Sequence, residues 1–165
     1  MTRVISARLT LAMIALISMT TAAFAQAPAA QPPAAPAPQA LTYEMAVQVI
    51  DAAEAEARKN KWNVTIVVTD AAGMPVVLRR LTGASPRSYD IAMRKAATVV
   101  ATKLTTADYG AQLKSNSVTE VPNGITFAGG VPIMRGTEFI GAVGTSGVTA
   151  AQDEIISKAG ATVIR

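Results

Sequence analysis

The sequence contains no cysteine and no histidine. Without Cys the chain can form neither a disulfide nor a thiolate metal site, so we expect no zinc site of that type and no iron–sulfur cluster. Without His it lacks the usual general base and the usual neutral metal ligand. Aromatic residues make up only 4% of the chain and no run of Lys and Arg exceeds two, which argues against a nucleic-acid surface.

The N-terminus has the pattern of a secretory signal peptide. Arg3 and Arg8 precede an uncharged apolar run over residues 9–19, and residues 23–25 fit the small-x-small cleavage pattern. We therefore expect cleavage after Ala25 and a secreted or periplasmic protein with no membrane span after cleavage. The alternative, a retained anchor, is disfavoured because the run is shorter than the ~20 residues that span a bilayer.

Residues 26–40 consist only of Ala, Pro and Gln and hold five of the nine prolines. Such a segment buries little apolar surface and favours extended conformations, so we interpret it as a linker. Residues 41–165 then form one compact domain. Removal of residues 1–25 takes away two arginines and no acids, which lowers the net charge from +4 to +2.

Apolar periodicity and capping signals predict four helices and five strands in this domain. Ser85-Pro86, Thr105 with Asp108, and Thr149 with Gln152 mark three helix starts. We expect helices at 43–60, 86–102, 105–113 and 150–159, and strands at 64–69, 75–81, 125–127, 131–134 and 138–145. Because short turns connect neighbouring strands, the sheet should be mainly antiparallel, with helices packed on it in an α+β fold.

Glycines are dense at residues 129–130 and 141–147, between apolar β-branched residues. This spacing indicates strand ends that pass close to another backbone or to a ligand. We expect a niche for a flat or anionic ligand where these ends meet the last helix. Asp153 and Glu154 lie in that helix's first turn, where they either compensate the helix dipole or face a ligand. Lys95 is either solvated or ion-paired, or it faces an anion.

Enzyme signatures are weak. Ser146 lies among glycines without the G-x-S-x-G spacing, and no His is present to activate its hydroxyl. Gly141, Gly144 and Gly147 do not make a dinucleotide fingerprint, because that motif needs a βαβ unit with an acid roughly 20 residues further on, and the sequence ends before that position.

Several segments, in this order and spacing, resemble the GlcG/HbpS family of heme-binding proteins. They are 67–73 (VVTDAAG), 81–84 (LTGA), the helix positions Ser88, Ala92 and Lys95-Ala96, 129–133 (GGVPI), 141–147 (GAVGTSG) and 152–154 (QDE). The resemblance covers nearly all of residues 41–165. It implies a profilin-like sandwich, a five-stranded antiparallel sheet with helices on its faces, that assembles into homo-oligomers. It also implies heme binding in some members, with a role in redox sensing, and an association with small-acid metabolism in others.

One departure from the family pattern concerns the iron. Family members often have His directly after the Asp-x-x-Gly turn, where this chain has Met74. Without His or Cys, heme iron can be held axially only by Met, Tyr, Lys or an oxygen ligand. We expect Met74 or Tyr89 as the axial ligand, with Arg94 or Lys95 meeting a propionate. The full set of predicted ligand-binding residues is Met74, Ser88, Tyr89, Arg94, Lys95, Gly129, Gly130, Pro132, Ser146, Gly147, Asp153 and Glu154.

Three hypotheses follow. The first is an exported, oligomeric protein that binds heme or a related small molecule without catalysis of its own. The second is an enzyme that acts on a small carboxylate, with Lys95 and either Asp153 or Glu154 as acid–base partners. The third is a structural or accessory subunit without an enclosed pocket.

Overall fold

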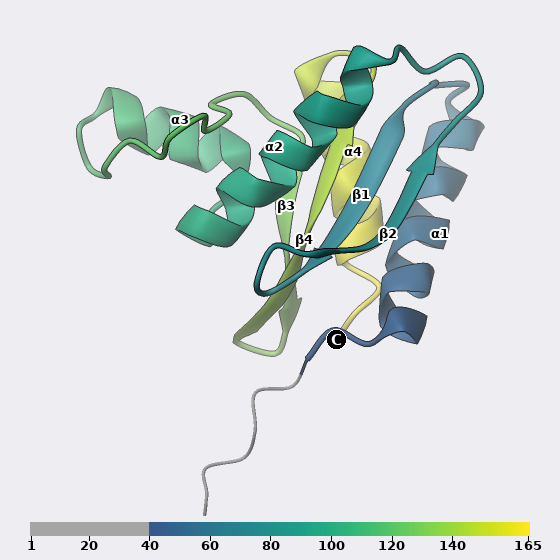
Figure 1. The fold of residues 1–165 in the computed structure, drawn as a ribbon, viewed down its shortest axis with the longest axis horizontal. Coiled ribbons are helices and arrows are strands. Elements are labelled where there is room, and N and C mark those ends of the chain that lie inside the picture. The colour runs from purple at the N-terminus through teal and green to yellow at the C-terminus, as the bar shows by residue number, and fades with distance from the viewer. Residues whose placement is uncertain (1–39) are drawn as a thin grey trace, which may run out of the picture. The chain divides into compact units, whose positions relative to one another are not determined.

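A computed structural model describes residues 40–165 (Figure 1). Four helices and four strands occur within this range. In chain order they are α1 (Tyr43–Lys59), β1 (Thr65–Asp70), β2 (Pro75–Arg80), α2 (Arg87–Thr102), α3 (Thr106–Lys114), β3 (Gly130–Arg135), β4 (Glu138–Ser146) and α4 (Ala150–Ala161). The predicted signal peptide lies outside the described residues, as does the predicted linker up to residue 39. No helix of residues 40–165 is both long and apolar enough to cross a membrane.

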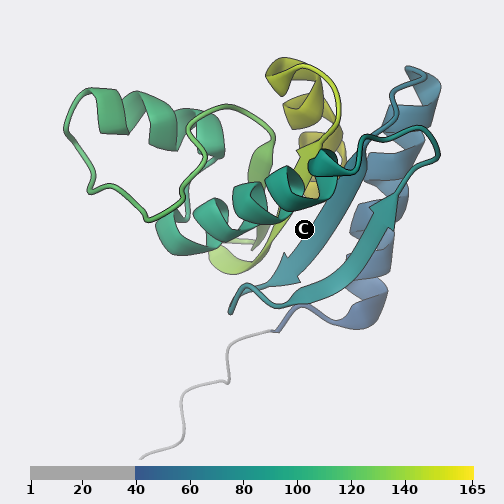
Figure 2. The same ribbon diagram turned by 45° about the horizontal axis from the view of Figure 1, so that its top comes forward.

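The four strands form one antiparallel sheet in the order β2-β1-β4-β3. Helices α1 and α4 cover one face of the sheet, and α2 lies across the other face (Figures 1 and 2). Strand β4 is therefore central and is paired on both sides, to β1 and to β3. The predicted α+β class with an antiparallel sheet and packed helices is confirmed.

The main core lies between the sheet and the helices α1 and α4. Small residues recur at helical spacing along α1, and because their side chains are short, the helix packs closely on the sheet. Strand β1 is buried over residues 65–69 because helices cover both of its faces, and β4 is buried over residues 140–146. The buried core residues from helices and strands include Ala46, Val49, Ile50, Ala53, Ala57, Ile66, Val68, Ile133, Ile140, Val143 and Ile156.

Two of the three predicted helix starts are confirmed. The Thr105 hydroxyl accepts from the Asp108 N–H, and Thr149 with Gln152 forms a full capping box. The third was wrong in detail. Helix α2 begins at Arg87 after Pro86, without a side-chain cap. The backbone carbonyl of Ser85, and not its hydroxyl, accepts from the Ser88 N–H.

The predicted fifth strand at residues 125–127 is wrong, and the sheet has four strands. The Ile125 N–H donates to the Thr98 hydroxyl on α2, at 2.9 Å, instead of to a neighbouring strand. The preceding residue closes a turn, because the Gly124 N–H donates to the Val121 carbonyl. The local apolar pattern was that of a strand, but a helix side chain satisfies this backbone group and holds the segment as a loop against α2.

Candidate functional site

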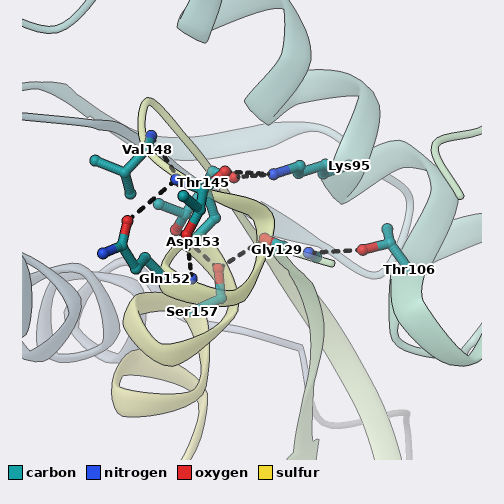
Figure 3. Close-up of polar contacts among 10 residues, drawn as sticks. Lys95, Thr106, Gly129, Thr145, Val148, Gln152, Asp153 and Ser157 are labelled. Carbon is teal, nitrogen blue, oxygen red and sulfur yellow. Dashed lines mark hydrogen bonds and ion pairs between the residues drawn. The ribbon is translucent and has the colours of Figure 1, made fainter. Parts of the chain in front are cut away.

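A buried ion pair joins the middle of α2 to the first turn of α4 (Figure 3). The Lys95 Nζ lies 2.7 Å from Asp153 Oδ2 and donates a second hydrogen bond to the Thr145 carbonyl, at 2.8 Å. The Lys95 side chain has no exposed surface, and that of Asp153 is 3% exposed. Fully buried Lys and Asp side chains are rare unless they are paired, so this contact is the most unusual polar feature of the domain.

Neighbouring groups hold both members of the pair in place. The second oxygen of Asp153 accepts from the Val148 N–H, at 3.2 Å, just before α4. One turn further along α4, the Ser157 hydroxyl contacts the Thr145 hydroxyl at 2.7 Å and the Gly129 carbonyl at 2.8 Å. The network therefore ties α4 to the end of β4 and to the residue before β3 (Figure 3).

Burial shifts the protonation of both groups away from the charged form. It lowers the pKa of Lys95 against the opposing effect of the Asp153 carboxylate. It raises the pKa of Asp153 against the opposing effects of Lys95 and the Val148 N–H. Burial and the ion pair therefore act in opposite directions on both groups.

The glycine-rich strand ends pack against the protein itself. A Cβ on Gly129, whose φ is +123°, would strike Lys95 Nζ. A Cβ on Gly144 would strike the Ala92 carbonyl, so this glycine lets α2 lie directly on β4. The niche that we predicted at these glycines is thus filled by Lys95, Asp153 and the α2 backbone. Glycine is needed at these positions so that other parts of the protein can pack closely against the strand ends, and not so that a ligand can approach them.

The open space lies beside this network, between the N-terminal half of α2 and the loop at residues 124–127. It is a cleft of about 420 Å³, a size typical of small-molecule sites. We call it the α2 cleft, and its lining residues are Arg87, Asp90, Ile91, Arg94, Gly124, Ile125, Thr126 and Phe127. Arg94 donates from Nε and from one terminal nitrogen to the Asn123 carbonyl, which fixes the guanidinium at the wall.

Phe127 connects the α2 cleft to the buried pair. Its ring lines the cleft and is 46% exposed, and its centroid lies 5.1 Å from Lys95 Nζ. This distance is that of a cation–π contact. The ring therefore borders both the ammonium and the open cleft.

The structure brings some of the predicted site residues together. Lys95, Asp153 and Gly129 are in direct proximity, and a Cβ on Gly130 would meet the Lys95 carbonyl. Ser146 is buried at the end of β4, next to Thr145. Arg94 lies one residue before Lys95 and faces the cleft.

Other predicted residues lie elsewhere. Ser88 is buried against the Thr65 hydroxyl, and Gly147 approaches the Asn63 carbonyl. The Glu154 carboxylate is paired with Lys158 at 2.8 Å along α4. Pro132 lies on the edge strand β3, in a separate apolar groove formed with the C-terminal residues.

The two predicted axial ligands are far from each other. The hairpin turn that carries Met74 lies next to Val100, because a Cβ on the neighbouring Gly73 would contact that side chain. Tyr89 lies eleven residues before Val100 on the same helix, a distance of roughly 16 Å. Both side chains are largely exposed, Met74 at 64% and Tyr89 at 49%, and neither lines the α2 cleft.

Sequence reasoning missed four functional candidates. Arg87 and Asp90 line the cleft with Arg94, at spacings of three and four residues along α2, which place them on one side of the helix. Ser157 follows Asp153 by one helical turn, which is also a readable spacing. Phe127 was assigned to a strand, and nothing in its local sequence indicates that it covers a lysine 32 residues earlier.

Comparisons with known proteins assign this chain to one protein family. A family model described as "Haem degrading protein HbpS-like" matches residues 41–162. Protein GlcG of Escherichia coli strain K12 is 36% identical over 108 residues, which are 64% of this chain and 81% of GlcG. An uncharacterized 15.0 kDa protein of Citrobacter freundii is 30% identical over 124 residues, 72% of this chain and 87% of that protein.

Solved structures agree with the sequence comparison. The crystal structure of a double mutant of Streptomyces reticuli HbpS is 31% identical, with a TM-score of 0.72 over 83% of this chain and 95% of that one. A PduOC–heme complex is 28% identical, with a TM-score of 0.65 over 77% of this chain and 96% of that one. Sequence and fold lead to the same assignment: the chain belongs to the HbpS-like family.

Proposed function

We propose that this chain is an exported protein that binds heme or a related carboxylate-bearing small molecule in the α2 cleft. The observation that carries the proposal is the lining of that cleft. Two arginines, Arg87 and Arg94, line it together with one acid, Asp90, so the basic groups are in excess. The half-exposed Phe127 and two isoleucines supply its apolar surface. Guanidinium groups bind carboxylates in a bidentate manner, and an aromatic face stacks on a planar ligand.

The cleft fits the organic part of heme better than its iron. The two arginines suit propionates, and Phe127 suits one face of the macrocycle. Among the side chains that line the cleft, only those of Asp90 and Thr126 have oxygen atoms that could bind the metal, and none has sulfur or imidazole nitrogen. Met74 and Tyr89, our predicted axial ligands, do not line it. A heme bound here would therefore be held mainly through its carboxylates and its plane.

Two findings from relatives support heme as the ligand. The family model is described as haem degrading, and PduOC has been solved as a heme complex. Export, homo-oligomerisation and a role in redox sensing belong to the same proposal. They are supported by the signal-peptide pattern and by the family resemblance.

Hemin titration of the mature protein, beginning at residue 26 and read in the Soret band, tests the proposal. We expect a saturable band shift at micromolar hemin that weakens when Arg94 is changed to Gln and persists when the remote Arg58 is changed to Gln. A stable Soret band over time indicates binding alone, whereas progressive bleaching with a reductant and oxygen indicates degradation. Absence of any shift at micromolar hemin would reject heme as the ligand.

A second function, an enzyme acting on a small carboxylate, is favoured by one observation. That hypothesis required Lys95 and an acid of α4 to be close, and Lys95 contacts Asp153 at 2.7 Å. The remaining acid candidate, Glu154, pairs with Lys158 instead. Conversion of a small hydroxy or oxo acid that is unchanged in a Lys95→Met variant would exclude this function for the pair.

A further inference from the structure

The Lys95 ammonium has one donor that no oxygen accepts. An ammonium carries three N–H donors. Asp153 Oδ2 accepts one and the Thr145 carbonyl accepts another, at 2.7 and 2.8 Å. The Phe127 ring, whose centroid lies 5.1 Å from Nζ, is the other neighbour of the ammonium, and a ring face is a weaker partner than an oxygen.

The neighbours of the ammonium differ in how they are held. Asp153, Thr145 and Gly129 are buried and belong to, or lie next to, regular elements. Phe127 is almost half exposed and lies in the loop between α3 and β3. Within residues 40–165, no backbone hydrogen bond is formed by Thr126, Phe127 or Ala128. The ring can therefore turn aside without breaking a hydrogen bond of the network.

We propose that Lys95 is the innermost binding group of the α2 cleft, reached when the Phe127 ring turns aside, and that it donates its third N–H to an uncharged oxygen of a carboxylate-bearing ligand. This inference rests on the proposed function of the cleft. It adds a binding residue and narrows the class of ligand.

The charges around the cleft assign the two ends of the ligand. Asp153 already balances the charge of Lys95, so a second carboxylate at that depth would leave an excess negative charge out of water. The inner group is therefore a carbonyl or hydroxyl oxygen. The outer group is a carboxylate, because two arginines line the cleft against one acid, Asp90. Arg94 has donors left after binding the Asn123 carbonyl.

Reductive methylation with formaldehyde and cyanoborohydride, mapped lysine by lysine by mass spectrometry, measures access to Lys95. Phe127→Ala should raise the rate at Lys95 by about tenfold, the scale of a partly desolvated cation–π contact. Phe139→Ala is a matched control, because Phe139 lies 3.8 Å from another ammonium, that of Lys103. It should leave the Lys95 rate unchanged. If the alanine variant has too low a melting temperature to be tested, Phe127→Leu replaces it, because leucine keeps an apolar side chain at this position without a ring.

A matched pair of probes tests the class of ligand. Butyrate has a carboxylate alone, and 3-hydroxybutyrate adds one uncharged oxygen. We expect 3-hydroxybutyrate to slow methylation of Lys95 at least about threefold more than butyrate, and Arg94→Gln to abolish that difference.

Two results would overturn the proposal: a Lys95 rate in Phe127→Ala that equals the wild-type rate, or equal protection by the two acids. Methylation needs no heme, so its outcome is separate from that of the hemin titration. If hemin binds but Phe127→Ala does not raise the methylation rate of Lys95, only this inference is rejected. If that rate rises and 3-hydroxybutyrate protects selectively but hemin does not bind, only heme as the ligand is rejected.

Discussion

Replacing Lys95 with Met gives the sharpest test of the buried pair. The variant keeps the volume and apolar stem of the lysine but removes the cation from a carboxylate that is 3% exposed. Breaking a buried pair in this way typically costs about 3–5 kcal/mol, because the remaining charge stays out of water. In a domain of this length, each kcal/mol of lost stability lowers the melting temperature by about 4 °C. The melting temperature should therefore fall by roughly 12–20 °C at pH 7.

The stability that is lost in the Lys95→Met variant should depend on pH, with a larger loss at higher pH. Burial already raises the pKa of Asp153, and without Lys95 the main opposing effect is gone. A carboxyl whose pKa is higher in the folded than in the unfolded state favours folding when it is protonated. The destabilisation should therefore be nearly absent below about pH 4 and should grow as pH rises through the folded pKa of Asp153.

Thermal and urea unfolding of the mature protein at pH 4 and pH 7 measure both effects. Lys158→Met is a matched control, because it breaks the half-exposed pair with Glu154 on the same helix and should cost only about 0.3–0.5 kcal/mol. The double variant Lys95→Met with Asp153→Leu should recover most of the loss. A loss below about 1 kcal/mol at pH 7, or an equal loss at both pH values, would refute the reasoning.

Three further predictions concern the backbone and the cleft. Gly129→Ala should cost at least about 3 kcal/mol in urea unfolding, because its Cβ would strike Lys95 and its φ is +123°, whereas Gly136→Ala, at φ +59° with open space around it, should cost about 1 kcal/mol. Arg94→Gln should weaken hemin binding about tenfold in the Soret titration, and an equal affinity in the variant would contradict the carboxylate contact. Metal-free protoporphyrin IX should bind within about threefold of hemin in a fluorescence-quenching titration, since the cleft offers iron only oxygen ligands, and a hundredfold preference for hemin would indicate a protein ligand to the iron.

The fold was largely predictable because its signals are local. The spacing of Ala46, Ala53 and Ala57 indicates the buried face of α1, and the capping box at Thr149 marks the start of α4. The segment at residues 125–127 could not be placed in the same way. Its apolar residues suit a strand, but the Thr98 hydroxyl on α2 binds the Ile125 N–H, and only tertiary structure brings those two groups together.

The buried pair was predictable in its two residues, whereas the cleft was predicted only at Arg94. Lys95 and Asp153 were identified as candidates, but their sequence context also suited a solvated lysine and an acid that only compensates a helix dipole. Their contact depends on α2 crossing β4 at Gly144, which sequence spacing does not reveal. The cleft depends on where a loop without regular structure leaves Phe127, and loop geometry is the part of a fold that local patterns specify least.

The strand order has a consequence for synthesis of the chain. Strand β1 pairs with β2 almost at once, but its other edge must wait for β4, whose first residue is translated 68 positions after the last residue of β1. A nascent chain that has not yet reached Glu138 therefore leaves the backbone N–H and C=O groups along one edge of the apolar strand β1 unpaired, and pairings over such separations form slowly. A ribosome stalled in this interval would release a fragment prone to aggregation and dependent on a holding chaperone.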